Sequence, residues 1–153
     1  MKKDIFPVLF VFLLLSGLTA GPVMARMVAV KNDNVNMRSG PSLDKKILWK
    51  LGIGFPLKVT GKKGDWLKVQ DFEGTVGWVH KDTVNRSGHM IVKAQRKSKG
   101  KINIRNKPDT GGRIVAKAYY GVVFETLEQK KDWVKVRHKD VTGWIKRSLL
   151  WGF

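Results

Sequence analysis

The 153-residue chain contains no cysteine. It can therefore form no disulfide, offers no thiol nucleophile, and has no cysteine for lipid attachment behind its hydrophobic leader. Acidic residues are also few, with 12 Asp and Glu against 30 Lys and Arg. They lie mostly at predicted turns, so a pair of catalytic carboxylates in a cleft is not expected.

Histidine is scarce as well, and His80, His89 and His138 lack the spacing of metal ligands. The sequence also has no Gly-rich phosphate-binding loop. These absences predict a protein that is not an enzyme and that holds no metal and no organic cofactor.

Long hydrophobic runs are limited to one near the start. The apolar run at 5–15 follows Lys2 and Lys3, precedes the small-residue end at Ala25, and has the pattern of a secretory signal. It is shorter than the roughly 20 residues of a membrane span. We expect residues 1–25 to be a cleaved helical signal peptide, with Ala20 as the second candidate site and a retained anchor as the alternative. The mature protein would be exported, periplasmic or extracellular, with no membrane span.

Basic charge dominates the rest of the chain. The whole sequence carries a formal charge of +18, and +17 remains once the two Lys and one Asp of the leader are set aside. The electrostatic field of so large a positive charge attracts polyanions in a salt-dependent way, so an acidic polymer or surface is the expected partner. A basic surface that only keeps the protein soluble is the alternative. Nucleic acid is disfavoured as the partner by the export signal.

The sequence repeats itself. Residues 35–75 align without gaps on 102–142, and a Gly-Trp step follows each segment at a shift one residue shorter. The residues that recur in the second copy are Asn36, Arg38, Pro41, Ile47, Lys50, Gly54, Lys63, Asp65, Trp66, Lys68, Val69, Thr75, Gly77 and Trp78. The chain is therefore a tandem duplication.

Each repeat has the pattern of short strands separated by Gly, Pro, Asn and Asp turns, with no sustained helical period. We predict an all-β protein with domains at 27–84 and 90–153 and a linker at 85–89. Alternation sends Leu67 and Val69 into the core and Trp66 and Lys68 outward. The second repeat follows the same rule.

The pairing of the last two strands of each repeat can be predicted from the turn between them. If Gln70 pairs with Val76, Lys68 lies opposite Trp78 on the outer face. The corresponding pairing of Arg137 with Thr142 places Lys135 opposite Trp144. Both repeats would then carry the same pair of a cation and an indole ring.

Four spaced motifs occur in the same order in both repeats: Asn-x-Arg-x-x-Pro, a Gly about thirteen residues after the Pro, Asp-Trp-x-Lys-Val, and Gly-Trp-Val/Ile. This set resembles bacterial Src-homology-3-like (SH3-like, SH3b) domains, two in tandem, over nearly all of the mature chain. The resemblance implies two small antiparallel barrels of about five to seven strands each. It also implies targeting to the cell wall, often by recognition of peptidoglycan. Such domains usually accompany a catalytic domain, which this sequence does not contain.

Aromatic and Arg side chains are the candidate ligand contacts, because rings stack on sugars or peptides and guanidinium groups grip carboxylates. They are Arg38, Trp49, Trp66, Trp78, Arg105, Tyr119, Tyr120, Trp133 and Trp144. Two alternatives stay open: each Arg ties its own turn to the barrel, and each Trp only packs across strands. Trp49, Tyr119 and Tyr120 differ between the repeats, which makes them candidates for specificity.

The sequence therefore predicts an exported, non-catalytic module that binds peptidoglycan or another anionic envelope polymer. The alternative is an adaptor that docks onto an envelope protein, because Trp, Tyr and Arg are also the residues enriched at protein interfaces.

Overall fold

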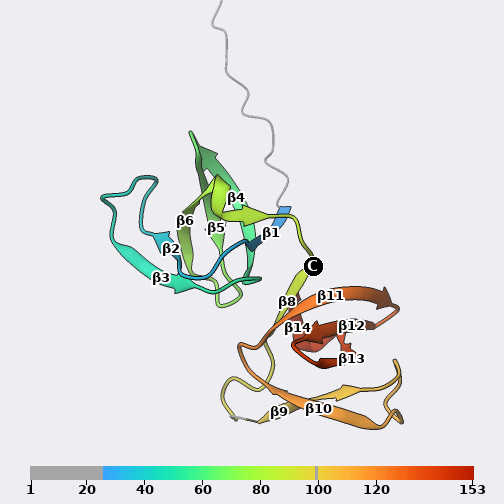
Figure 1. Cartoon of the computed structure of the whole chain (residues 1–153). Coiled ribbons are helices and arrows are strands. Elements are labelled where there is room, and N and C mark those ends of the chain that lie inside the picture. The colour runs from blue at the N-terminus through green and yellow to red at the C-terminus, as the bar shows by residue number, and fades with distance from the viewer. Residues whose placement is uncertain (1–25, 99) are drawn as a thin grey trace, which may run out of the picture.

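The computed structural model describes residues 26–98 and 100–153, and these residues form two antiparallel β-sheets, each curled into a small open barrel (Figure 1). The predicted signal peptide lies outside the described residues. The strands of the first barrel are β1 (Arg26–Val30), β2 (Val35–Arg38), β3 (Ile47–Leu51), β4 (Pro56–Lys63), β5 (Trp66–Gln70), β6 (Val76–His80) and β7 (Val84–Asn85). Those of the second are β8 (His89–Val92), β9 (Lys101–Arg105), β10 (Ile114–Tyr119), β11 (Val123–Lys130), β12 (Trp133–His138), β13 (Val141–Lys146) and β14 (Leu150–Gly152).

The two sheets have the same topology. The strand order is β3-β2-β6-β5-β4-β1-β7 in the first and β10-β9-β13-β12-β11-β8-β14 in the second. Short 3₁₀ turns, η1 (Lys81–Thr83) and η2 (Arg147–Leu149), precede the last strand of each barrel. The all-β prediction is confirmed. Asn85 and His89 already belong to strands, so only residues 86–88 connect the barrels.

Alternation along the strands builds each core. Leu67 and Val69 of β5 are buried, as are Val134 and Val136 of β12, while Lys68 is exposed. The predicted pairing is also confirmed, because Gln70 lies opposite Val76 and Arg137 opposite Thr142. Because the side-chain period of a strand is two, this register decides which residues of each hairpin face outward.

The recurring glycine of the Gly-Trp motif has a steric role. A Cβ on Gly143 would lie 2.6 Å from Cγ2 of Ile104 and 2.8 Å from the carbonyl oxygen of Arg105. A Cβ on Gly77 would lie 2.7 Å from Cγ of Met37. Only glycine therefore lets β13 approach β9, and β6 approach β2, this closely.

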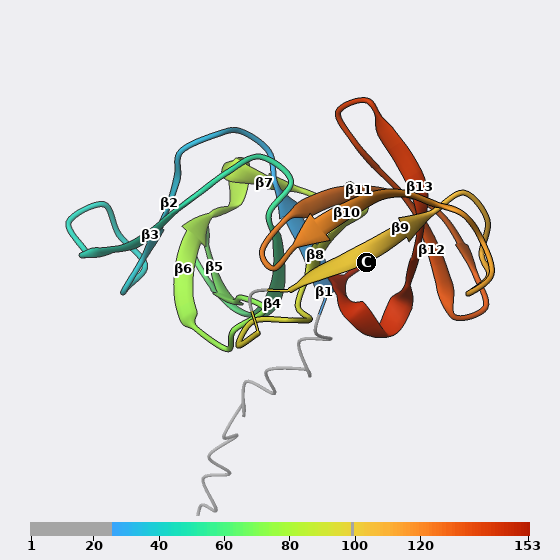
Figure 2. The same ribbon diagram turned by 90° about the horizontal axis from the view of Figure 1, so that it is seen from below.

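The barrels contact each other along β4, β8 and β14 (Figures 1 and 2). Ala29 of β1 and Ile91 of β8 point away from their barrel cores, yet they are 0% and 1% exposed. Gly54 of the first barrel adopts φ +76°, and a Cβ there would lie 2.6 Å from Cδ2 of His89 in the second. The outer faces buried in this way make the barrels one packed unit.

Aromatic rings complete the contact. Phe72 of the first barrel packs on Tyr120 of the second, with ring centroids 5.2 Å apart, and also on Phe55 of its own barrel at 5.9 Å. The Tyr120 hydroxyl donates a hydrogen bond to the carboxylate of Glu73, and Arg96 lies 3.5 Å from the same carboxylate. We call Phe55, Phe72, Glu73, Arg96 and Tyr120 the junction cluster.

Within the described residues, no helix has the length and hydrophobicity that a membrane crossing requires.

Candidate functional site

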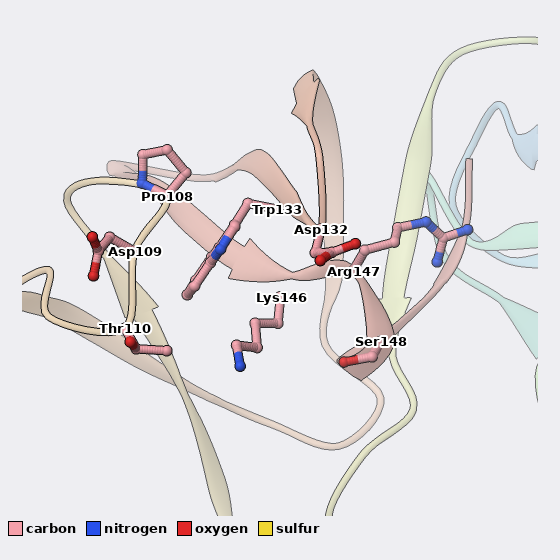
Figure 3. A pocket seen from close by; sticks show the side chains of 8 residues that line it. All are labelled: Pro108, Asp109, Thr110, Asp132, Trp133, Lys146, Arg147 and Ser148. Atoms are coloured by element: carbon pink, nitrogen blue, oxygen red, sulfur yellow. The ribbon is translucent and has the colours of Figure 1, made fainter.

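A groove on the second barrel is centred on Trp133, the first residue of β12 (Figure 3). Its volume is about 740 Å³. One wall is the loop between β9 and β10, with Pro108, Asp109 and Thr110, and the other is formed around Lys146 and η2. The ring of Trp133 stands between these walls, half-buried, so one part of the indole is held by the protein and the rest faces the groove.

The groove continues on both sides of this ring. A hollow of about 280 Å³ brings Lys101 and Arg105 to Trp133, and another of about 260 Å³ brings Lys130 and Lys131. Because all three hollows share Trp133, they form one surface, which we call the Trp133 groove.

The charges of the groove have both signs. Lys146 lies opposite Trp133 in the strand register, with its ammonium 5.9 Å from the ring centroid. The carboxylate of Asp109 accepts a hydrogen bond from the backbone N–H of Gly111. Asp132 has no salt-bridge partner among the described residues. The arrangement offers an aromatic face, an ammonium and a carboxylate to one ligand.

Arg147 explains why Asp132 is free of a salt bridge. Its guanidinium turns away from the groove and donates to the carbonyls of Leu150 and Gly152, at 3.1 Å each. The corresponding residue of the first barrel behaves differently. Lys81 pairs with Asp65 at 2.8 Å, and this hydrogen-bonded ammonium lowers the pKa of the Asp65 carboxyl.

The first barrel also presents its tryptophan differently. Trp66 is half-buried, and the ring of His80 packs edge-on against it with centroids 5.5 Å apart. In the first barrel, the loop between β2 and β3 corresponds to the β9–β10 loop that forms one wall of the groove. This loop contains Asp44, whose pKa is lowered to about 2 by a hydrogen bond from Ser42 and a second one from Lys45. The two barrels therefore share a framework but differ in the groups that surround the equivalent indole.

The two predicted arginines both contact their own loops. Nη1 of Arg38 donates to the carbonyl of Lys45 at 2.8 Å, and Nη1 of Arg105 donates to that of Gly112 at 2.6 Å. These hydrogen bonds are the ones expected if each guanidinium ties its own turn to the barrel, which is the alternative that the sequence left open. Arg105 also lines the Trp133 groove, so it can do both.

The second tryptophan of each repeat lies on the outer face, as predicted, but the two differ in exposure. Trp78 is half-buried opposite Lys68. Trp144 is only 8% exposed, with the Lys135 ammonium 6.0 Å from its ring centroid and Arg105 opposite it in register. Trp144 therefore presents less ring surface than Trp78 does, and a ligand contact at either ring stays a prediction.

The three aromatic residues that vary between repeats lie in three separate places. Trp49 is 54% exposed on β3, outside the Trp133 groove. Tyr119 is 53% exposed at the end of β10, with the Lys101 ammonium 4.7 Å from its ring centroid. Tyr120 belongs to the junction cluster, where burial and the hydrogen bond to Glu73 raise its pKa to about 12. Its ring packs against the first barrel, and a role of Tyr120 in specificity stays a prediction.

Several groove residues were not among the predicted site residues: Pro108, Asp109, Thr110, Asp132, Lys146 and Ser148. Lys146 could have been found, because the predicted register places it opposite Trp133. The loop residues could not, because their approach to Trp133 depends on how the β9–β10 loop folds over the barrel. The described residues contain no group of three or more His, Asp or Glu placed to hold a metal ion.

Comparison with known proteins identifies the family of the two repeats. The family model of the bacterial SH3 domain matches residues 31–85 and 98–152. A putative N-acetylmuramoyl-L-alanine amidase of Bacillus subtilis (strain 168), YrvJ, is 24% identical over an alignment of 122 positions that covers 76% of this chain and 24% of that protein. The chain thus spans about a quarter of the length of this relative.

Two solved structures show more distant likeness. NlpC2 from Trichomonas vaginalis has a TM-score of 0.36 and 13% identity over 83% of this chain and 48% of its own. The structure described as the endolysin LysPBC5 CBD has a TM-score of 0.35 and 16% identity over 82% of this chain and 92% of its own. With its motifs, its topology and two family matches that together span most of its length, the chain belongs to the bacterial SH3 domain family and contains two copies of the domain.

Proposed function

We propose that this protein is an exported, non-catalytic module that binds peptidoglycan or another anionic polymer of the cell envelope. The observation that supports this most directly is the Trp133 groove, in which a half-buried indole lies between basic side chains on both sides. The groove of the second barrel is the principal contact, and the first barrel adds a weaker one.

The chemistry of the groove suits such a polymer. The indole face stacks on the apolar face of a sugar ring or on a peptide. Lys146 and Arg105 attract carboxylates, while Asp109 and Asp132 attract amines, so a polymer with peptide branches of both charges finds a partner for each. The net charge of +17 that remains without the leader adds long-range, salt-sensitive attraction.

The matched relative supports the same class of ligand. It is named as an amidase that acts on N-acetylmuramoyl-L-alanine, and the shared segment is about a quarter of its length. We infer that the shared segment holds the polymer, whereas the rest of the relative supplies its reaction.

Co-sedimentation with intact sacculi tests this proposal. The chain from Arg26 to Phe153, which contains both barrels, is mixed with sacculi at low and at high salt, beside a Trp133→Ala variant. We expect wild-type retention that weakens but persists at high salt, and a clear loss in the variant. Circular dichroism checks that the variant is folded.

Three results would contradict the proposal. Retention that vanishes with salt and ignores Trp133 would mean that charge alone binds the polymer. Absence of retention at any salt would favour docking onto an envelope protein, and release of wall fragments by the purified chain would show that it is an enzyme.

A further inference from the structure

The second barrel has an apolar hollow that is separate from the Trp133 groove. It has a volume of about 190 Å³ and shares no lining residue with the groove. Ala116 and Ala118 of β10 form one side, and Val122 and Phe124 lie on the other. Tyr119 stands at its rim, with more than half of its surface exposed.

The hollow results from substitutions between the two repeats. Ala116, Ala118 and Val122 occupy the positions of Trp49, Leu51 and Phe55 in the first barrel. Trp49 lies opposite the buried Met37 in register, as Ala116 lies opposite Ile104, so both lie on the strand face that carries core residues. Trp49 lies at the margin of its core, with 54% of its surface exposed. Three smaller side chains at these positions remove the atoms that would fill the space.

The strand beside the hollow is an edge strand. β10 is the first strand in its sheet order, and among the strands that the structure describes it pairs with β9 alone. Its other side therefore has backbone N–H and C=O groups with no partner in the sheet. Ile114 and Val115 of this strand are also exposed. An extended peptide can pair with such an edge and place alternate side chains into adjacent pockets.

The charge around the hollow selects the kind of peptide. Lys117 lines it, and the Lys101 ammonium lies over the rim residue Tyr119. None of the lining residues is acidic. A peptide that carries carboxylates on either side of its apolar residue would be complementary to this rim.

We propose that the second barrel binds an extended acidic segment of a partner protein along β10, with one bulky apolar side chain in the hollow. At about 30 Å³ for each water, the space equals about six waters, which is the scale of one large side chain. The partner is a polypeptide because an unpaired strand edge needs backbone amides, which lipids and glycans cannot supply as a ladder.

NMR titration of the ¹⁵N-labelled chain from Arg26 to Phe153 tests the proposal. The probe is an acetylated nonapeptide amide of alternating Thr and Glu with a central Phe, and matched peptides carry Ala for Phe or Lys for Glu. We expect amide shifts in β10 and around Val141, and affinity at least tenfold weaker for the Ala peptide. The Lys peptide should not bind.

Variants that fill the hollow with a larger side chain show whether the peptide binds there. Ala118→Leu and Ala116→Trp introduce the residues that the first barrel has, and either one should reduce affinity for the Phe peptide about tenfold. Trp133→Ala should leave this affinity unchanged, which separates the hollow from the polymer groove. If one filling variant does not fold, the other and the peptide pair still decide the matter.

Four outcomes would overturn the proposal. They are equal affinity for the Phe and Ala peptides, shifts confined to the Trp133 groove, and binding only to phosphatidylglycerol vesicles that the filling variants abolish. The fourth is a dimer in sedimentation that the filling variants dissociate, which would make a second copy of this chain the occupant of the edge.

Discussion

At the scale of single residues, the two equivalent tryptophans differ in what surrounds them. Trp133 faces an open groove, whereas His80 covers part of Trp66 and Lys81 neutralises the neighbouring Asp65. We expect Trp133→Ala to weaken binding of soluble wall fragments about fivefold to tenfold, and Trp66→Ala to weaken it less. Titration calorimetry of both variants measures this difference. Equal losses would show that the barrels contribute equally.

Tyr120 allows a prediction for pH. Burial and the bond to Glu73 raise its pKa from 10.0 to about 12, so the neutral phenol is favoured in the folded protein. Between these values the unfolded chain has lost this proton while the folded chain keeps it. The contribution of Tyr120 to stability is therefore complete below pH 10 and is lost as the pH rises through about 12.

Spectrophotometric titration checks this shift in a Tyr119→Phe background, which leaves Tyr120 as the only tyrosine. We expect Glu73→Gln to move the titration of Tyr120 toward its usual value, because the carboxylate supports the neutral phenol. If Tyr120 titrated at its usual pKa both with and without Glu73→Gln, the contacts of Tyr120 in the junction cluster would be contradicted.

At the scale of elements, the approach of β13 to β9 depends on Gly143. A methyl group there would collide with Ile104 and with the backbone of Arg105, so Gly143→Ala must push the strands apart. We expect a loss of about 1–3 kcal/mol in the free energy of unfolding. Gly52→Ala is the matched control, because a Cβ on Gly52 would lie 3.6 Å from its nearest neighbour, Oδ1 of Asp33, which is an ordinary van der Waals contact. Urea denaturation compares the two, and equal costs would refute the steric explanation.

At the scale of the whole molecule, the junction cluster holds the barrels in a defined relation. Phe72 is its central ring, in contact with Phe55 and Tyr120. We expect Phe72→Ala to replace one cooperative thermal transition by two, because the contact between barrels weakens while each core stays intact. Scanning calorimetry measures this. Trp49→Ala, which removes an exposed ring outside the cluster, should keep a single transition.

This packing bears on the proposed function. Two sites on one packed unit would meet a polymer with a defined spacing, and the second contact would be favoured by the high effective concentration that the first creates. If Phe72→Ala retains its binding to isolated fragments but loses retention on sacculi, the fixed spacing contributes to avidity.

The tandem repeat, the strands, the inward faces of β5 and β12 and the pairing of the last hairpins were all predictable. They depend on a period of two and on the number of residues in a turn, which are local properties of the chain. The excess of basic charge was equally evident, because it requires only counting.

The tertiary structure decided which of the outward residues are accessible. Alternation places Trp133 and Trp144 relative to the sheet, but strands and loops distant in the sequence leave one in a groove and cover the other. The same holds for Tyr120, which meets Phe72 only because the barrels pack together. The burial of a side chain depends on neighbours from the whole fold. A local sequence pattern therefore predicts which face of the sheet a residue lies on, but it does not predict which residues pack against it.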